Sequence, residues 1–277
     1  IINNLEFDHA DIFKDLAAIQ KQFHHLVRTV PGAGNIIMPS SDENINQVMA
    51  QGCWSCQHHF GIKPDDNWQY RLIEEDGSRF EIIFSDDQGV TKESGRVVWS
   101  QSGLHNVKNA LAAVIAAYQV GVNVSQSCEA LSNFIGVKRR MEVICESQGV
   151  TIYDDFAHHP TAIKSTLEGL RAKVGDDFIL AIIEPRSATM KMGVHQQTLA
   201  SSVKSADQVL WYQNAAIDWD MASLSDAIEI PSMINNKLDD LIEAAVNLAH
   251  SNVHIVIMSN GGFDDFHNKL SDAIKSL

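Results

Sequence analysis

The stretch from residue 150 to residue 170 constrains the fold more than any other part of this sequence. It opens with an apolar run that predicts a buried strand. Pro160 suits the first turn of a helix, because its missing N–H group has no partner there in any case, and the apolar residues after it recur at helical spacing. Four ionisable side chains stand between strand and helix: Asp154, Asp155, His158 and His159.

Open α/β sheets bind their ligands at the carboxyl ends of their strands, which is where this turn is expected to lie. The four ionisable side chains therefore indicate a ligand site. The structural alternative is an Asx-type helix cap with two solvated histidines, and the residues alone leave both interpretations open.

The second half of the chain alternates strands and helices. Strands are predicted at 142–146, 150–154, 178–183, 207–211 and 253–258. Helices are predicted at 160–172, 194–204, 237–250 and 263–276. This alternation is typical of a mainly parallel sheet with right-handed crossovers, so the predicted fold class is α/β.

The first half has a more mixed pattern. Helices are predicted at 10–27, 43–51, 105–119 and within 121–134. Strands are predicted at 35–38 and 96–101, and the alternating stretch 68–84 around Asp76-Gly77 predicts a hairpin. The pattern changes near residues 136–140, which divides the chain into predicted domains 1–137 and 138–277.

Charge and composition exclude several classes of function. A net charge of −14 argues against a nucleic-acid partner held through phosphate contacts. No apolar run is long enough to span a bilayer, and no signal-peptide pattern is seen. The four cysteines do not resemble a disulfide framework for a chain of this length. We therefore expect a cytoplasmic protein with no membrane and no nucleic-acid partner.

The first residues are unusual for the beginning of a protein. The chain lacks an initiator Met, and residues 1–5 predict the end of a buried strand. Because a core strand rarely opens a protein, we expect this chain to be the C-terminal part of a longer one.

A cluster of acidic residues surrounds one histidine near the beginning of the chain. Glu6, Asp8, His9 and Asp11 lie within a few residues of one another. Oxygen-rich sites with one nitrogen ligand suit Mg²⁺ or Mn²⁺ beside a phosphate. The alternative is a helix N-terminus that is enriched in acid because its dipole favours negative charge.

Amides and guanidinium groups mark two further segments. Asn106 and Asn109, with His105 beside them, are three residues apart at a helix start, so both carboxamides can face one ligand such as the edge of an adenine. The alternative is N-capping by Asn106. Arg139 and Arg140 suit phosphate, ribose hydroxyls or carboxylate, or belong to a solvated basic linker.

Two loops after predicted strands complete the candidates. Arg186 and Lys191 follow an apolar strand and suit an anionic group, although an ordinary polar loop has the same composition. The turn 259–262 contains two glycines, which let backbone N–H groups approach an anion, although many turns contain glycine.

Cysteine and histidine also gather, at Cys53, Cys56, His58 and His59. A closed zinc site needs four ligands that converge tetrahedrally, and the Cys–His spacing here is far shorter than in usual sites. The pattern therefore disfavours zinc or redox chemistry.

In this order, the motifs resemble those of the Mur ligase family of ATP-dependent peptidoglycan enzymes. The matching patterns are Asn-x-Glu-x-Asp-His-x-Asp at 4–11, His-Asn-x-x-Asn at 105–109, Arg-Arg-Met-Glu at 139–142 and Asp-Asp-x-x-His-His-Pro at 154–160. The resemblance covers essentially the whole chain. It implies the C-terminal part of a central ATPase domain, followed by a Rossmann-like C-terminal domain with a mainly parallel sheet.

Two runs resemble one branch of the family, at 184–193 and 259–263. That branch joins UDP-N-acetylmuramate to the murein tripeptide L-Ala-γ-D-Glu-meso-diaminopimelate in peptidoglycan recycling. The sister branch that adds L-alanine has a His-Arg-Tyr-Thr-Arg run in the first of these places, which this chain lacks.

The resemblance implies a mechanism with ATP and Mg²⁺. ATP would phosphorylate the lactyl carboxylate of UDP-N-acetylmuramate, and the amine of the tripeptide's L-alanine would attack the acyl phosphate. The protein would supply positioning and charge neutralisation.

The resemblance also implies roles for particular residues. The implied Mg²⁺ ligand is His9. The implied ATP-binding residues are His105, Asn106, Asn109, Arg140 and Asp155. The implied catalytic residues are His158, Arg186 and Lys191. The implied peptide-binding residues are His158, Arg186, Ser259, Asn260, Gly261 and Gly262.

The chain departs from the family pattern in two places. It contains no Gly-x-x-x-x-Gly-Lys-Thr phosphate loop, which in the family lies upstream of residue 1 together with the UDP-sugar domain. We therefore expect the chain alone to bind ATP poorly and not to catalyse. His24 and His25 stand about where several sisters carry a carbamylated lysine, so that feature is not predicted.

Three other functions are weighed against this one. A UDP-N-acetylmuramate–L-alanine ligase and a non-catalytic module that binds a nucleotide or a peptide stay open. An NAD-dependent dehydrogenase is disfavoured because the Gly-x-Gly-x-x-Gly fingerprint is absent.

Overall fold

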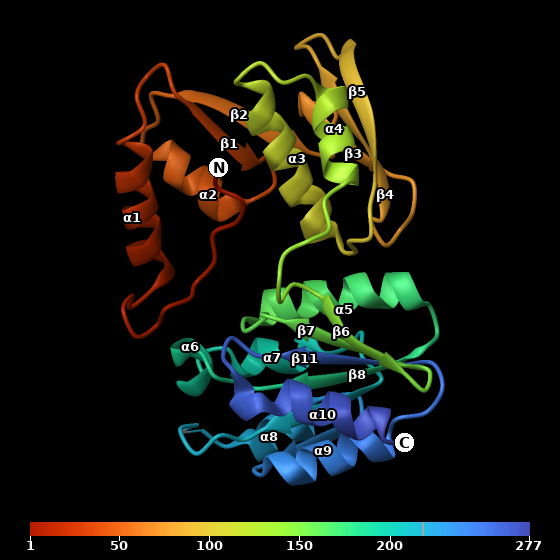
Figure 1. Ribbon diagram of the computed structural model, residues 1–277. Coiled ribbons are helices and arrows are strands. Elements are labelled where there is room, and N and C mark those ends of the chain that lie inside the picture. Colours follow the sequence, from red (N-terminus) through yellow and green to blue (C-terminus); the bar gives the residue numbers. More distant parts are fainter. Residues whose placement is uncertain (218) are drawn as a thin grey trace. The chain divides into compact units, whose positions relative to one another are not determined.

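The computed structural model describes residues 1–217 and 219–277, which divide into two compact units, Ile1–Ile135 and Gly136–Leu277. Each unit has one sheet and its own hydrophobic core (Figure 1). The predicted α/β class is confirmed. Among the described residues, no helix combines the length and the apolar character that a membrane span needs.

The sheet of the first unit has the strand order β1-β2-β3-β4-β5. Its strands are β1 (Asn35–Pro39), β2 (Cys56–Gly61), β3 (Trp68–Leu72), β4 (Arg79–Ser85) and β5 (Thr91–Val98). The first three strands run parallel, and the last three pair antiparallel. Between β3 and β4, Gly77 has a φ of 78°, which L side chains rarely adopt. The hairpin predicted around Asp76-Gly77 is confirmed.

Helices cover both faces of this sheet. They are α1 (Leu16–Val27), α2 (Glu43–Ala50), α3 (Leu104–Tyr118) and α4 (Val124–Ser132). Asp15, Asp42 and Asn123 cap α1, α2 and α4, each accepting a hydrogen bond from a backbone N–H three residues on. Apolar side chains of α1 and α2 pack on one face of β1, and those of α3 and α4 pack on the other face of the sheet.

Three predictions for the first half were wrong in detail. β2 was not predicted, because its residues Cys-Gln-His-His are exposed or half-buried and give no apolar pattern. The helix predicted from residue 10 begins at Leu16, and Ile12, which fitted its apolar spacing, is 69% exposed. Residues 1–5 are not a strand, although Ile2 and Leu5 are buried and the Ile2 N–H donates to the Ile37 carbonyl at 2.9 Å.

The sheet of the second unit has the order β10-β9-β8-β11-β7-β6. Its strands are β6 (Glu142–Ser147), β7 (Val150–Asp155), β8 (Phe178–Ile183), β9 (Gln208–Tyr212), β10 (Ser232–Asn235) and β11 (Val253–Met258). Every neighbouring pair is parallel except β6 with β7. These two are joined through Gln148 and Gly149, which both have positive φ as a tight hairpin turn requires. The mainly parallel sheet is confirmed.

Two layers of helices enclose this sheet. They are α5 (Pro160–Val174), α6 (Ala188–Lys191), α7 (Gln196–Ser202), α8 (Met221–Ala227), α9 (Leu238–Asn247) and α10 (Phe266–Lys275). Buried side chains of α5, α7 and α8 pack on one face of the sheet, and those of α9 and α10 pack on the other. Figure 1 shows α5 on the opposite side of the sheet from α9 and α10. Pro160 occupies the start of α5 as predicted. The short elements α6, α8 and β10 were not predicted.

The strand order creates a switch point in the second unit. The chain passes from β7 to β8, builds outward through β9 and β10, and returns to place β11 between β7 and β8. All three central strands point the same way. The loops that follow them therefore meet at one edge of the sheet, the place where such folds bind ligands.

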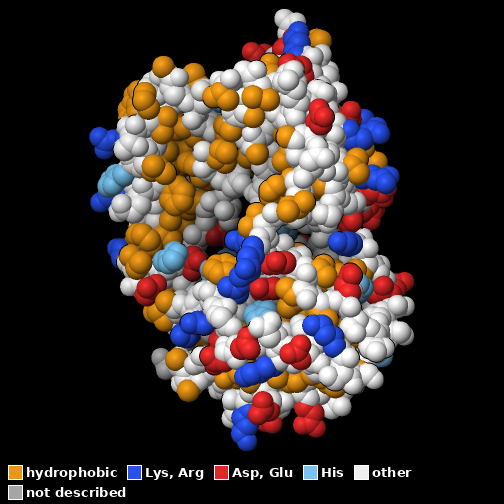
Figure 2. Space-filling view, in the orientation of Figure 1, with side chains coloured by type: hydrophobic (Ala, Val, Ile, Leu, Met, Phe, Trp, Pro, Cys, Tyr) orange, Lys and Arg blue, Asp and Glu red, His pale blue; other side chains and the backbone are white. Residues whose placement is uncertain are grey.

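The surfaces of the two units differ in character. In Figure 2, hydrophobic side chains gather over the part of the first unit that contains α1 and α2, whereas charged side chains of both signs are interspersed over the second. The large hydrophobic residues exposed in the first unit include Ile12, Leu26, Trp54 and Ile62. Gathered apolar surface is typical of an interaction surface.

At the amino-terminal edge of the second sheet, Arg171 joins two loops, the one between α5 and β8 and the one between α7 and β9. Its guanidinium donates to the carbonyls of Ser205, Gly175 and Asp177 at 3.2, 2.7 and 2.7 Å, and it pairs with the Asp207 carboxylate. We expect Arg171→Gln to lower the free energy of unfolding by about 2 kcal/mol, because one side chain then leaves several acceptors without a charged donor. Urea unfolding of the chain measures this change.

Lys164→Gln is the matched control on the same helix. Lys164 is exposed and lies 3.8 Å from Glu168 in an i,i+4 pair, so its loss should change stability by less than about 0.5 kcal/mol. Equal effects of the two substitutions would show that the Arg171 contacts do not stabilise this edge.

Candidate ligand site at the strand ends

Three loops meet at the carboxyl-terminal edge of the second sheet. They follow β7, β8 and β11, and backbone hydrogen bonds tie each to its neighbour. The Ser259 N–H donates to the Asp155 carbonyl at 3.1 Å, and the Glu184 N–H donates to the Met258 carbonyl at 3.0 Å. The structure therefore brings together the Asp-Asp-x-x-His-His turn, the Arg186 loop and the 259–262 turn, which the sequence placed far apart.

Asp155 is held by donors from its own chain. Only 3% of the residue is exposed. Its carboxylate accepts from the Met141 N–H at 2.9 Å, the Ala157 N–H at 2.8 Å and the Thr166 hydroxyl at 3.4 Å. Burial raises the pKa of the Asp155 carboxyl, and these hydrogen bonds oppose that rise. The bond to Ala157 is an Asx turn, so the structural alternative for this motif is also present.

The neighbouring Asp154 binds a different set of groups. Its carboxylate lies 3.1 Å from Arg139 Nε and 3.2 Å from His267 Nε2. Burial acts to raise the pKa of Asp154, but the hydrogen bond and charge of His267, together with Arg139, outweigh it and hold the pKa below its usual value. The guanidinium of Arg139 thus compensates the negative charge of the Asp154 carboxylate.

The two histidines of the turn have different partners. His158 Nδ1 lies 2.8 Å from the Phe156 carbonyl. A carbonyl only accepts, so Nδ1 carries the proton and Nε2 is left as the acceptor of the neutral ring. His159 is the N-cap of α5, and its Nδ1 accepts a hydrogen bond from the Thr161 N–H at 3.3 Å. The centroids of the His159 and His195 rings lie 4.5 Å apart. His158 is thus the member with a ring nitrogen available to a ligand.

Buried hydrogen bonds organise the turn after β11. The Ser259 hydroxyl is fully buried; it donates to the Glu184 carboxylate at 2.5 Å and accepts from the Gly261 N–H at 3.0 Å. The carboxamide oxygen of Asn260 is buried without a hydrogen-bond partner among the described residues. A buried acceptor in this condition is costly, and it lies in the turn predicted to contact a substrate.

Arg186 lies directly against this turn. A Cβ atom added to Gly261 would stand 1.8 Å from Arg186 Nη1, whereas one added to Gly262 would meet nothing within 4 Å. Arg186 is exposed, and Lys191 is half-buried at the end of α6. Glycine at 261 therefore leaves the space that the guanidinium occupies.

The first unit contains the predicted adenine residues on α3. The Asn106 side-chain NH₂ donates to the Ser102 carbonyl at 2.8 Å, and the Asn109 side-chain oxygen accepts from Asn3 at 2.5 Å. The N-cap position is Gly103, so Asn106 does not cap through that position. His105 is half-buried beside them. Each amide keeps hydrogen-bonding capacity beyond the bond described here.

The predicted metal residue, His9, is exposed in a left-handed turn with a φ of 53°. Within residues 1–217 and 219–277, no three His, Cys, Asp or Glu side chains form a group that could hold a metal ion. Mg²⁺ often takes one or two protein ligands and fills its shell with water and phosphate oxygens. His9 fits such a site as one ligand, but not a cage built by the protein. The four cysteines are free.

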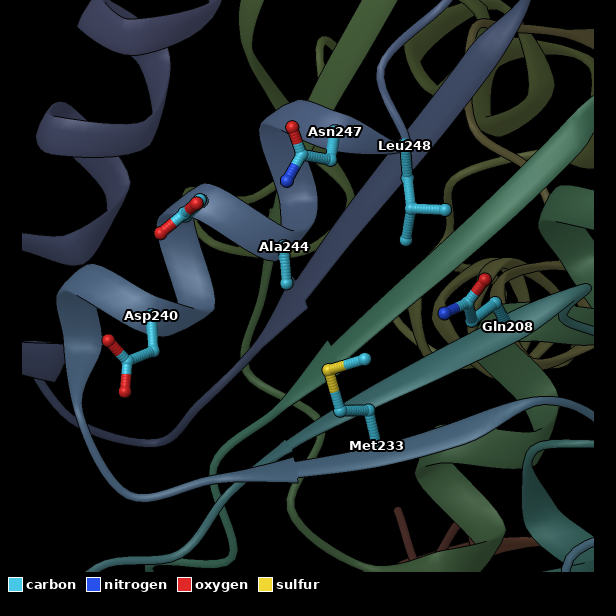
Figure 3. A pocket seen from close by; sticks show the side chains of 7 residues that line it. Gln208, Met233, Asp240, Ala244, Asn247 and Leu248 are labelled. Atoms are coloured by element: carbon cyan, nitrogen blue, oxygen red, sulfur yellow. The ribbon is translucent and has the colours of Figure 1, made fainter.

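A separate cavity lies away from these loops (Figure 3). It has a volume of about 310 Å³ and opens between α9 and the strands β9 and β10. Figure 3 shows Met233 on its strand floor and Asp240 and Asn247 along the helix. The lining residues are Gln208, Met233, Asp240, Glu243, Ala244, Asn247 and Leu248. This lining has two carboxylates and no cation, so it does not suit an anionic ligand.

Sequence reasoning missed part of the site. The part that was missed is the cluster in which Asp154 contacts Arg139 and His267. In the sequence, Arg139 cannot be distinguished from its neighbour Arg140, or Asp154 from its neighbour Asp155. His267 belongs to no recognisable motif. Arg140, which was singled out, is exposed and rests on the Phe156 ring at 5.5 Å. Overall, the edge presents Arg140, Arg186 and the His158 ring, a set suited to neutralising an anionic ligand.

Comparisons with known proteins agree with this arrangement. The Mur ligase middle domain matches residues 1–117, and the Mur ligase glutamate ligase domain matches residues 139–261. A relative from Escherichia coli strain K12, UDP-N-acetylmuramate–L-alanyl-γ-D-glutamyl-meso-2,6-diaminoheptandioate ligase, is 48% identical over 99% of this chain and 59% of its own length. The chain thus spans a little over half the length of the curated relative it matches.

Two further comparisons are consistent with that one. The UDP-N-acetylmuramate–L-alanine ligase of Desulfitobacterium hafniense is 36% identical over 76% of this chain and 45% of its own length. The crystal structure of a murein peptide ligase from Psychrobacter arcticus has a TM-score of 0.71 at 43% identity, covering 99% of this chain and 57% of that one. Because the two Mur ligase domains match residues 1–117 and 139–261, which together make up most of the chain, the chain belongs to the Mur ligase family.

Proposed function

We propose that this chain is part of an ATP-dependent ligase that joins UDP-N-acetylmuramate to the tripeptide L-Ala-γ-D-Glu-meso-diaminopimelate. The observation that carries the proposal is the 48% identity, over nearly the whole chain, to a relative named for that reaction. The chain has no phosphate-loop motif and spans 59% of that relative. We therefore propose that activity requires N-terminal residues of the kind that the relatives have, and that the enzyme acts in the cytoplasm during peptidoglycan recycling.

The reaction needs charge neutralisation more than covalent chemistry from the protein. The lactyl carboxylate attacks the γ-phosphorus of ATP, ADP leaves, and the peptide amine then displaces phosphate from the acyl carbon. Bound Mg²⁺ would neutralise phosphate charge. In the first unit, His9 would supply one metal ligand, and the Asn106 and Asn109 amides, beside His105, would contact the adenine.

The second unit would supply the remaining contacts. Arg140 is exposed and free to reach phosphate or ribose oxygens. Asp155 would act on the nucleotide indirectly. Its carboxylate accepts a hydrogen bond from the Met141 N–H and so holds the backbone next to Arg140. On the peptide side, Arg186 would bind a carboxylate with two parallel hydrogen bonds, and Lys191 would add positive charge.

The His158 ring and the 259–262 turn would face the same peptide. With its proton on Nδ1, His158 has Nε2 available to accept a hydrogen bond from the attacking amine or to take up its proton. Ser259 is occupied by Glu184, so the groups of the turn that remain for a ligand are the Asn260 carboxamide and the exposed Gly262 backbone.

The first test is phosphate release by the full-length protein that contains this chain. We expect release that depends on both UDP-N-acetylmuramate and the tripeptide, and little release when L-alanine replaces the tripeptide. Faster release with L-alanine would favour the sister ligase, to which the 36% identical relative belongs by name. No release with either acceptor would leave a nucleotide- or peptide-binding module and contradict the ligase assignment.

A second test concerns the Arg186 side chain. We expect Arg186→Ala to raise the KM for tripeptide about 10-fold or more while changing the KM for ATP little, because a charge-assisted carboxylate contact is worth about 1.5 to 3 kcal/mol. Steady-state kinetics with each substrate varied in turn measures the two effects. Equal rises in both constants would remove Arg186 from the peptide site.

Gly261→Ala tests the same contact from the other side. Its methyl group would displace the Arg186 guanidinium, which is the flexible end of an exposed side chain, so stability should change little. We expect the KM for tripeptide to rise as it does in Arg186→Ala. Gly262→Ala adds a methyl group in open space within the same turn and should raise that KM less. A larger effect at Gly262 would contradict the proposed geometry.

A further inference from the structure

The side chain of Arg139 binds groups from two other segments of the second unit. Its Nε lies 3.1 Å from the Asp154 carboxylate, and its Nη2 donates to the carbonyls of Ser259 and Gly261 at 2.7 and 2.9 Å. The guanidinium carbon also lies 5.2 Å from the Phe156 ring centroid. One half-buried side chain thus connects the beginning of the unit, the end of β7 and the turn after β11.

The backbone of Arg139 is fixed as well. Its N–H donates to the Glu142 carboxylate at 2.8 Å, and its carbonyl accepts from the Phe156 N–H at 2.9 Å. Arg139 and Met141 both have left-handed φ values, 59° and 51°. Such conformations are unfavourable for residues other than glycine, so the surrounding bonds must hold them. The residue between them, Arg140, is aimed by this held backbone.

Left-handed residues also gather at the other end of the network. Phe263, Asp264 and Asp265 follow the 259–262 turn with φ values of 49°, 47° and 64°. His267, the second residue of α10, has its Nε2 atom 3.2 Å from the Asp154 carboxylate. Both strained segments are therefore anchored on the same aspartate, one through Arg139 and the other through His267.

We propose that Arg139 is a positioning residue that sets the Arg140 segment and the 259–262 turn relative to one another. Its side chain binds groups of the protein itself. It acts through Arg140, which faces the nucleotide, and through Gly261, which lies against Arg186. This inference rests on the proposed function for its kinetic consequence, but the structural coupling between the two segments stands independently of it.

The structural consequence is tested first, on the 277-residue chain without any ligand. Hydrogen exchange measures how well the amides of 139–141, Phe156 and Gly261 are protected. We expect Arg139→Gln to speed exchange in both segments by at least about 10-fold, because local opening loses its charged anchor. Arg139→Lys should not restore protection, since a single ammonium cannot reach a carboxylate and two carbonyls in a fork.

Arg171→Gln is the matched control. Arg171 also binds one carboxylate and several backbone carbonyls, but at the opposite edge of the same sheet. It should destabilise the unit without speeding exchange selectively at 139–141 and Gly261. If Arg139→Gln fails to fold, Asp154→Asn removes the charge that holds Arg139 and should speed exchange at the same amides by a smaller factor. Unchanged exchange at Gly261 in the folded variants would overturn the proposal.

The kinetic consequence is tested in the full-length enzyme. A residue that sets two segments should raise the KM for ATP and the KM for tripeptide together, by about 10-fold to 100-fold, whereas Arg171→Gln should leave both within about twofold at temperatures well below unfolding. If the wild-type protein has no ligase activity but the variants show the predicted exchange pattern, the proposed ligase function is wrong and the structural coupling of the two segments stands. Active wild type with unchanged KM values in Arg139→Gln would reject Arg139 as a positioning residue.

Discussion

The two buried carboxylates at the end of β7 hold the ligand edge of the second unit together. Asp154 balances Arg139 and His267, while Asp155 accepts from two backbone N–H groups and the Thr166 hydroxyl. Burying adjacent carboxylates is unfavourable unless each is paired. Here every bond that satisfies them also fixes a segment of backbone, so the conformations of 139–141 and of the turn after β11 depend on the same two residues.

The strand order explains why this edge exists. Because β11 inserts between β7 and β8, side chains from residues about a hundred positions apart become neighbours. The central strands could be predicted from sequence because they are long, apolar and bounded by polar turns. The sequence did not predict four other elements, β2, α6, α8 and β10. These are short or polar and form through tertiary packing, so they show no hydrophobic periodicity along the sequence.

The loops that meet at this edge could be predicted from the sequence, but the contacts of each residue within them could not. Motifs at strand ends predicted which loops gather. They could not show which residue of the Arg139–Arg140 pair, or of the Asp154–Asp155 pair, makes a given contact. The backbone φ values and the strand register decide which way each side chain points. His267 enters through α10, and Gly261 matters through the guanidinium beside it. These relations exist only after folding.

The proposed function assigns acyl-phosphate chemistry on a muramyl carboxylate to the protein that contains this edge. Oxygen-18 transfer tests that chemistry. With UDP-N-acetylmuramate labelled in both oxygens of the lactyl carboxylate, we expect each turnover of the full-length protein in ordinary water to pass one labelled oxygen into phosphate, because the carboxylate oxygen bonds to phosphorus and leaves with it. Released phosphate without label, accompanied by peptide bond formation, would rule out the acyl phosphate.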